Sequence, residues 1–398
     1  MRRNPSSLVV AATAAIGLST MAVTAAVAAP SPNVHAARVC ATSSVPTVAS
    51  CLSMKLANDA GQAVSPSGGV ITPRAISGKT PTDIQDAYKL AGLSSSGRTV
   101  AIVDAYGYPK AEQDLAVYRS QWGLSPCTTA NGCLRIIDQN GGTNYPRYDN
   151  GWAQEQALDL DAVSAACPDC KILLVQASSN SIANLGKAVN RAASQAGVVA
   201  ISNSYGGGDL SDASYGAPYN HSGIAVTAST GDNGYQGGSF PASSHYVTAV
   251  GGTSLVKAAN TRGWSESAWN GAGSGCTTLN TAPTGQTFAM TNCSGRAIAD
   301  VSADADPNTG LAVYAPSTRN SSGWAQYGGT SLSSPIVASV YALSGNTAGY
   351  ANTIPYAHAS SLFDVTSGSN GTCASWCSAK TGWDGPTGLG TPNGTGGF

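Results

Sequence analysis

Residues 327–343 read YGGTSLSSPIVASVYAL, a glycine-led serine followed by an apolar run. Two glycines and a threonine lead to Ser331, which opens a small, apolar segment compatible with a helix. Pro335 is expected in the first helical turn, where its missing backbone N–H breaks no hydrogen bond. A serine at a helix N-terminus lies beside free N–H donors. The stretch therefore predicts either a nucleophile or an ordinary helix cap, and the remaining sequence has to distinguish the two.

Strand and helix patterns alternate before this stretch. Short apolar runs predict strands at residues 98–104, 171–176, 198–202 and 224–229. Longer patterned runs predict helices at residues 82–92, 112–122, 152–166 and 182–196. The alternation predicts an α/β fold, in which helices cover both faces of a mostly parallel sheet. Residues 229–398 are rich in glycine, serine and asparagine, and they are expected to form long loops of the same domain with a short strand at 246–250.

Charge is scarce in this chain. Only 10% of its 398 residues are charged, and the net charge is −1. Soluble domains usually carry about a quarter charged residues. The composition therefore argues against a partner bound through electrostatic attraction, such as nucleic acid or a membrane surface. A surface whose polarity comes from serine, threonine, asparagine and glycine changes its charge little on acidification, which would suit an acidic medium.

Residues 1–29 have the pattern of a secretory signal. Arg2 and Arg3 precede an apolar run, which ends in small residues at Ala26, Ala28 and Ala29. The mature chain is expected to be secreted and extracellular, and an uncleaved membrane anchor is the alternative. Residues 30–70 show no long periodic pattern and are expected to form a short propeptide or linker. Residues 71–398 would then form the main domain.

Ten cysteines fall in five close pairs along the chain. An even number after a signal sequence favours disulfides over metal binding. We expect sequential pairing: Cys40 with Cys51, Cys127 with Cys133, Cys167 with Cys170, Cys276 with Cys293, and Cys373 with Cys377. Zinc binding or redox activity at Cys167 and Cys170 is the alternative, but no second CxxC motif or paired histidines complete a zinc site.

Two carboxylates lie four residues apart in the helix predicted at 152–166. Glu155 and Asp159 would project from one face of that helix, one turn apart. Carboxylates this close raise each other's proton affinity, so one can hold a proton for the other. The alternative is a solvated acidic face without a role, and Asp161, on another face, fits that alternative better.

A further aspartate follows the strand predicted at 224–229. Asp232, in STGDNG, is either a site residue at the carboxyl end of a parallel strand or part of a glycine-flanked turn. The four histidines are His35, His221, His245 and His358, and none lies in a context typical of a catalytic base. A base for Ser331 is therefore expected to be a carboxylate, which acts best when its pKa is raised or the medium is acidic.

Several motifs in a shared order make the chain resemble the sedolisin, or serine-carboxyl peptidase, family. They are EQALD at 155–159, TASTGDNG at 227–234 and GGTSLSSP at 328–335. The segments FPASSHYVTAVGGT at 240–253, DVSADADPNTG at 300–310 and GWDGPTGLGTP at 382–392 look like scaffold signatures of that family. The resemblance spans residues 72–393 and implies a subtilisin-like fold. It also implies a secreted, acid-acting serine endopeptidase.

The resemblance assigns roles to four residues. Ser331 would be the nucleophile, Glu155 its base, Asp159 the group that orients Glu155, and Asp232 a protonated donor to the oxyanion. Asp104 lies about where a subtilisin has its catalytic aspartate, and without a histidine it is expected to be structural or an outer member of the proton network. Gly328 and Gly329 replace the more usual Ser-Gly, and the region before residue 71 is shorter than the prodomain typical of the family.

The resemblance also implies one structural Ca²⁺ near the C-terminus. The expected ligands are the carboxylates of Asp364 and Asp384 and the backbone carbonyls of Val365, Lys380 and Gly382. Oxygen-only ligation suits calcium rather than zinc. The alternative is two unrelated loop aspartates, and Lys380 departs from the glycine usual in the family.

These expectations leave three functions open. The first is an acid endopeptidase, expected to be a monomer, that acts on protein or peptide substrates; tripeptidyl-peptidase action at the same site also stays open. The second is a secreted binding or structural protein that kept the fold without activity. The third is a neutral subtilisin-like peptidase that uses Asp104 and a histidine. Hydrolysis of denatured protein across a range of pH separates them.

Overall fold

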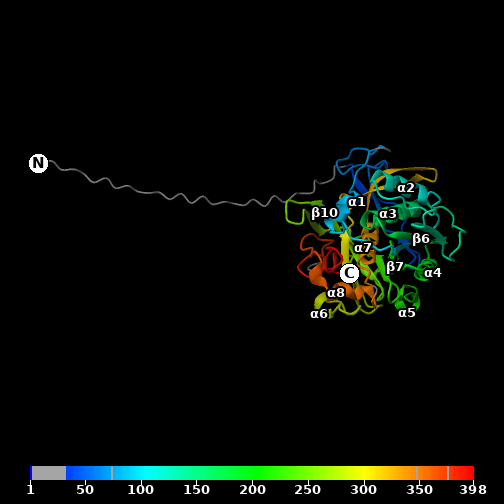
Figure 1. The fold of residues 1–398 in the computed structure, drawn as a ribbon. Coiled ribbons are helices and arrows are strands. Elements are labelled where there is room, and N and C mark those ends of the chain that lie inside the picture. Colours follow the sequence, from blue (N-terminus) through cyan, green and yellow to red (C-terminus); the bar gives the residue numbers. More distant parts are fainter. Residues whose placement is uncertain (2–32, 73–74, 347, 374–375) are drawn as a thin grey trace.

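The computed structural model describes residue 1 and residues 33–72, 75–346, 348–373 and 376–398. The signal sequence predicted at residues 1–29 lies outside the described residues, apart from Met1. None of the described helices is long and apolar enough to cross a bilayer. Figure 1 shows α7 (Thr330–Ser344) in the middle of the folded part with α3 (Asn150–Ala166) packed beside it.

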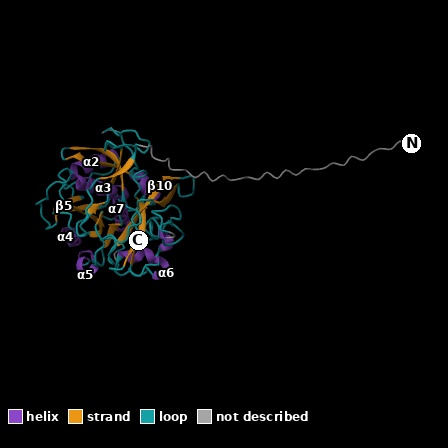
Figure 2. Ribbon diagram, turned by 180° about the vertical axis from the view of Figure 1, so that it is seen from behind, coloured by secondary structure: helices purple, strands orange, loops and turns teal. Residues whose placement is uncertain are grey.

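The central element is a sheet of eight described strands in the order β11-β10-β9-β7-β4-β6-β5, with β14 pairing to β10. The strands are β4 (Thr99–Ala105), β5 (Leu134–Asp138), β6 (Lys171–Ala177), β7 (Val198–Asn203), β9 (Ala225–Ser229), β10 (Thr248–Lys257), β11 (Trp264–Ala268) and β14 (Val301–Asp304). All their pairings are parallel except that of β10 with β11. Figure 2 accordingly places β5 and β10 on opposite sides of the molecule. The predicted mostly parallel α/β sheet is confirmed.

Helices cover both faces of this sheet, as predicted. Successive side chains of β4 point to opposite faces, so Val100 and Ile102 join one apolar core while Ala101 and Val103 join another. The first core contains residues of α3 and α7, together with α1 (Pro81–Ala87) and α2 (Ala111–Gln121). The second contains the apolar side of α4 (Ile182–Ala193). A parallel sheet buried on both faces needs such apolar strands.

A second, antiparallel sheet packs against α3 and involves the N-terminal region. Its order is β1 (His35–Arg38), β3 (Met54–Ala57), β16 (Ser321–Gly328) and β15 (Leu311–Thr318). A short strand β2 (Ser50–Cys51) pairs separately with β8 (Tyr205–Gly206). The described part of the segment predicted as a propeptide or linker, residues 30–70, is therefore packed into the fold. Its removal during maturation stays a prediction.

Residues 229–398 are mainly loops, as predicted, but they contain more strands than the one expected at 246–250. The region contains β10, β11, β14, β15, β16 and α7, and also β12 (Gly275–Thr277) and β13 (Arg296–Ile298). The prediction took the glycines as signs of loops, but some of them lie inside strands. A Cβ on Gly252 of β10 would press against Ala305 and the ring of Trp269, so glycine here serves close packing rather than a turn.

Short helices complete the described fold. They are α5 (Asp212–Tyr215), α6 (Phe288–Thr291), α8 (Ile354–Ala357) and the 3₁₀ turns Ala217–Tyr219, Ala351–Thr353 and Ala359–Ser361. All five predicted disulfides are present, and the described residues contain no free cysteine. The bond between Cys167 and Cys170 occupies both sulfurs, so the zinc and dithiol alternatives do not hold in this structure.

Candidate active site

Ser331 lies in the first turn of α7, at the end of β16. Gly329 precedes the helix with a φ of 89°, a left-handed conformation that other residues rarely adopt. The Ser331 hydroxyl donates to the carbonyl oxygen of Ser204 at 3.2 Å. Its side chain is fully buried.

Pro335 is inside α7, in its second turn, and not in the first turn as predicted. A proline at this position cannot donate to the carbonyl of Ser331, four residues earlier. The hydroxyl of Ser204 approaches that free carbonyl at 3.4 Å. The proline therefore leaves the Ser331 carbonyl free at the start of α7, and the Ser204 hydroxyl, just after β7, is the donor beside it.

Glu155 and Asp159 face the same side of α3, as their spacing predicts, and both are fully buried. Glu155 accepts a hydrogen bond on Oε2 from the backbone N–H of Ser53 at 2.9 Å. Asp159 accepts one on Oδ1 from the hydroxyl of Ser204 at 2.8 Å. Ser204 thus connects Asp159 with Ser331, because its hydroxyl bonds the carboxylate and its carbonyl accepts from the serine.

Burial dominates the proton affinity of these carboxyls. The pKa of Glu155 is raised to about 8, chiefly by burial; hydrogen bonds from Ser331 and Ser53 act to lower it, and the nearby charge of Asp232 acts to raise it. The Ser331 hydroxyl is thus close to Glu155, although its hydrogen bond goes to Ser204 in this structure. Burial also raises the pKa of Asp159 well above its usual value, assisted by the charges of Asp104 and Glu155.

Asp104 is the third buried carboxyl in this group. It is the next-to-last residue of β4, is fully buried, and neither of its oxygens has a hydrogen-bond partner among the described residues. Burial, and next the charge of Glu155, raise its pKa well above the usual value. Three carboxyls in one dry space cannot all be ionised, so Asp104, Asp159 and Glu155 hold protons between them.

Asp232 lies beside the first residue of α7, Thr330. Its Oδ1 accepts from the backbone N–H of Thr330 at 2.8 Å and from the Thr330 hydroxyl at 2.9 Å. Its Oδ2 has no hydrogen-bond partner among the described residues, and Nη1 of Arg38 lies 3.9 Å from it. Burial raises the pKa of Asp232 to about 6, against the lowering effects of Thr330 and Arg38. One oxygen is therefore fixed while the other is free to carry a proton.

The structure brings Ser331, Glu155, Asp159 and Asp232 together from three elements of the chain. Asp161 lies on another face of α3, as predicted, but it is buried and accepts from the backbone N–H of Tyr314 at 3.0 Å rather than facing solvent. None of the four histidines is hydrogen bonded to a described residue of this group; His221 and His245, for example, approach the carbonyls of Pro218 and Thr281.

Sequence reasoning missed Ser204, Ser53 and Arg38. Ser204 could have been found, because it follows the predicted strand at 198–202 and so lies at the edge where parallel strands end. Ser53 and Arg38 carried no such signal. They lie in the segment interpreted as a linker, and only long-range pairing brings that segment to the site.

The predicted calcium ligands lie on adjacent loops. Gly382 donates its N–H to Oδ2 of Asp364 at 2.9 Å, and Lys380 donates its N–H to Oδ2 of Asp384 at 3.1 Å. No hydrogen bond among the described residues uses the carbonyl oxygens of Val365, Lys380 or Gly382. Two carboxylates and three uncommitted carbonyls form an all-oxygen donor set, whose chemistry fits Ca²⁺.

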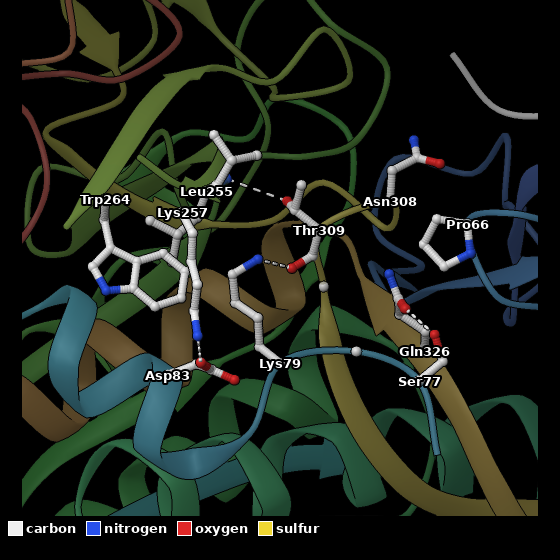
Figure 3. Close-up of a pocket in the computed structure, with 13 residues that line it drawn as sticks. Pro66, Ser77, Lys79, Asp83, Leu255, Lys257, Trp264, Asn308, Thr309 and Gln326 are labelled. Atoms are coloured by element: carbon white, nitrogen blue, oxygen red, sulfur yellow. Dashed lines mark hydrogen bonds and ion pairs between the residues drawn. The ribbon is translucent and has the colours of Figure 1, made fainter. Parts of the chain in front are cut away.

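A separate cavity of about 380 Å³ lies between the antiparallel sheet and the β10–β11 hairpin (Figure 3). Lys257 on its wall pairs with Asp83 at 3.1 Å, and Lys79 donates to the carbonyl of Thr309. None of the four candidate catalytic residues lines it. Its cations already have acidic or carbonyl partners, so its lining identifies no ligand.

Comparisons with known proteins agree with this geometry. Residues 141–356 match the Subtilase family. Kumamolisin from Bacillus sp. (strain MN-32) is 32% identical over 79% of this chain, and sedolisin from Pseudomonas sp. (strain 101) is 29% identical over 79%. The chain spans only 62% and 60% of the length of these two relatives.

A solved structure is also similar. Pseudomonas sedolisin, a serine-carboxyl proteinase in complex with two molecules of pseudo-iodotyrostatin, superposes with a TM-score of 0.67 at 27% identity. The match covers 80% of this chain and 96% of that one. The parallel sheet, the buried carboxyl group and these matches together place the chain in the subtilase family, among its sedolisin-type members.

Proposed function

We propose that this chain is a secreted serine endopeptidase that hydrolyses protein or peptide substrates under acidic conditions. The observation that carries the proposal is the convergence on Ser331 of three buried carboxyls from two elements, Glu155 and Asp159 of α3 and Asp232 after β9. No histidine of the described residues competes for the role of base, which disfavours the neutral subtilisin-like alternative.

Ser331 attacks the substrate carbonyl carbon, and Glu155 takes the proton of its hydroxyl. Asp159 orients Glu155 and shares the proton, since both carboxyls have raised pKa values in one dry space. The tetrahedral intermediate carries a negative oxygen, which receives hydrogen bonds from protonated Asp232 and from the backbone N–H of Ser331. Glu155 then protonates the leaving amine, and water hydrolyses the acyl group on Ser331.

Acid operation follows from the role of Asp232. Its carboxyl donates a hydrogen bond only when protonated, and its pKa of about 6 makes that form prevail in acid. Glu155 must be ionised at the same time, although its pKa in the closed, buried site is about 8. Water that enters with a substrate would lower the pKa of Glu155, because burial is the main cause of its elevation.

One Ca²⁺ is proposed near the C-terminus, held by the carboxylates of Asp364 and Asp384 and the carbonyls of Val365, Lys380 and Gly382. Its role is structural: it would neutralise two carboxylates and cross-link two loops. The free carbonyls and the all-oxygen donor set support this assignment.

Hydrolysis of denatured casein from pH 3 to 8 tests the proposed function, with wild type, Ser331→Ala and Glu155→Gln compared. We expect an acid optimum, complete loss in Ser331→Ala, and a loss of about 10²–10⁴-fold in Glu155→Gln. Activity that peaks near neutrality and survives Glu155→Gln would favour a histidine-driven enzyme. Absence of hydrolysis by the wild type at every pH would favour a binding protein.

A further inference from the structure

Asp232 lies in an irregular loop after β9, residues 230–237, called here the donor loop. One of its carboxyl oxygens is fixed by Thr330, and the other has no hydrogen-bond partner among the described residues. An oxyanion donor works only within about 2.7–3.1 Å of the oxygen that it stabilises. The contacts that fix the backbone of the donor loop therefore bear on catalysis.

A second segment, residues 270–274 between β11 and β12, runs beside the donor loop and is called here the supporting segment. Three backbone N–H groups donate across to the other segment: Gly273 to the Gly231 carbonyl at 2.7 Å, Gly234 to the Gly271 carbonyl at 2.8 Å, and Gln236 to the Ser274 carbonyl at 3.0 Å. The two backbones are in direct contact, because a Cβ on Gly273 would lie 2.2 Å from the carbonyl oxygen of Thr230. A displacement of the supporting segment is thus passed on to the donor loop.

Asn370, from the loops near the C-terminus, holds both segments at once. Its carbonyl oxygen accepts from the N–H of Tyr235 at 3.1 Å, and a Cβ on Gly234 would lie 2.3 Å from that same oxygen. Its side-chain Nδ2 donates to the Ala272 carbonyl and to the Ser274 hydroxyl, both at 2.7 Å. Asn370 therefore fixes the donor loop with its main chain and the supporting segment with its side chain.

The surroundings of Asn370 keep it in place. Its N–H donates to the Cys377 carbonyl at 3.0 Å, and the disulfide between Cys373 and Cys377 closes this part of the chain. The side chain is only 3% exposed, so water cannot readily replace its two hydrogen bonds. Its Oδ1 has no hydrogen-bond partner among the described residues, which costs stability that an apolar side chain would not cost. The value of the amide here lies in its two donated hydrogen bonds.

We propose that Asn370 is a positioning residue for the oxyanion donor, because it holds the donor loop and the supporting segment together so that Asp232 meets the developing oxyanion. The inference rests on the proposed roles of Ser331 and Asp232, and it adds a residue that does not touch the reacting atoms. No hydrogen bond between described residues joins Asn370 to Ser331 or Asp232. Asn370 acts through the backbone of the donor loop.

Loss of the Asn370 amide should lower kcat by about 10- to 100-fold, since a misplacement of about 1 Å can cost as much as 100-fold. KM should change less, because the oxyanion exists only after the substrate is bound. Water admitted between the two segments would also lower the pKa of Asp232, because burial is the main cause of its elevation. The fall of kcat/KM toward higher pH should then begin at a lower pH. The other groups that act on Asp232 remain: the Thr330 hydrogen bonds and the charges of Arg38 and Glu155.

The test compares the full chain as wild type, Asn370→Ala and Asn352→Ala in pH profiles of kcat and KM on a peptide that the wild type cleaves. Asn352 is the matched control: it is 1% exposed, its Nδ2 donates to the carbonyls of His245 and Val247, and its Oδ1 has no partner among the described residues. Both variants should lose a similar amount of thermal stability. Only Asn370→Ala should lose kcat and move the high-pH fall of kcat/KM. Equal kcat and pH profiles in the two variants overturn the inference.

A double-mutant cycle tests whether Asn370 acts through Asp232. In an Asp232→Ala background the donor is already absent, so adding Asn370→Ala should lower kcat by less than about twofold. The same loss in both backgrounds overturns the inference. Ser274→Ala is a milder variant for the case that Asn370→Ala does not fold. It removes one of the two acceptors of the amide and should lower kcat by about threefold, with the same direction of pH shift. In that case, an unchanged kcat and pH profile in Ser274→Ala overturns the inference.

The wild type separates this inference from the proposed function. Wild type that hydrolyses the peptide in acid, while Asn370→Ala behaves like Asn352→Ala, overturns the inference and leaves the proposed function standing. Wild type that hydrolyses neither peptide nor casein at any pH overturns both.

Discussion

Ser204 donates its hydroxyl to Oδ1 of Asp159 at 2.8 Å, while its backbone carbonyl accepts the hydroxyl of Ser331 at 3.2 Å. A single residue at the end of β7 thereby connects the nucleophile with the buried carboxyls of α3. The connection is built from a strand end and two helices, so it depends on the tertiary arrangement of all three.

We predict that Ser204→Ala lowers kcat for casein or a peptide substrate by about tenfold, because Asp159 loses a hydrogen bond worth about 1–1.5 kcal/mol. KM should change little, since the backbone carbonyl of Ser204 is retained. Ser339→Ala is the matched control: its hydroxyl is also buried but bonds to the Pro335 carbonyl within α7. Equal effects of the two variants on kcat would show that Ser204 only supports packing.

Asp232 offers a prediction on the pH profile. Asp232→Ala should lower kcat by about 10²–10³-fold, because an oxyanion donor is lost. Asp232→Asn keeps an acceptor for Thr330 and places an amide donor at the free position, so it should retain more activity than the alanine variant. An amide donates at any pH, whereas the carboxyl donates only below its pKa of about 6.

The fall of kcat/KM toward higher pH should therefore weaken or move upward in Asp232→Asn. The measurement is a full pH profile of peptide hydrolysis for wild type and both variants. If kcat/KM of Asp232→Asn falls at the same high pH as that of the wild type, Asp232 is not the group whose ionisation causes the fall.

The buried carboxyls predict how stability depends on pH. Burial raises the pKa of Glu155 from its usual 4.5 to about 8 in the folded chain, so the folded state retains a proton that the unfolded state has released. The stability contributed by this group is complete below about pH 4.5 and is lost as pH rises to about 8, by at most about 1.4 kcal/mol per pH unit.

Urea unfolding of Ser331→Ala, with and without Glu155→Gln, measures this contribution. Ser331→Ala removes the proposed nucleophile, so the sample cannot digest itself during the measurement. The double variant should lose less stability between pH 5 and 8 than its parent. Glu112→Gln is the control, because that carboxylate bonds to the exposed Thr129, and it should leave the slope unchanged. Identical slopes in all three would show that Glu155 is ionised in the folded chain.

Calcium removal should destabilise the folded chain. A ligand that binds only the native state adds about 2.7 kcal/mol at 100 times its Kd, so chelation at pH 6 should lower Tm by several degrees. Asp384→Asn should lower Tm in the same direction and abolish its response to chelator. Asp59→Asn, at an exposed carboxylate, should keep the response. A wild-type Tm that changes with neither chelator nor added Ca²⁺ would contradict the proposed Ca²⁺ site.

Local sequence pattern determined much of the fold. The apolar runs at β4, β6, β7 and β9 and the helices between them were predictable, because the periodicity of side chains along a strand or helix is written in adjacent residues. The spacing of Glu155 and Asp159 placed them on one face of α3 for the same reason. The five disulfides followed from cysteines that are neighbours in the sequence.

Tertiary structure alone decided the rest. The pairing of β3 with β16 joins residues more than 250 positions apart, and no local pattern contains it. The same long-range packing brings Ser53 to Glu155 and Arg38 to Asp232. It also determines the proton affinities, because the pKa of a carboxyl depends on the water and charge around it. The sequence by itself singled out Ser331 and the carboxyls proposed to serve it, whereas only the folded chain brought them together, because they come from separate elements.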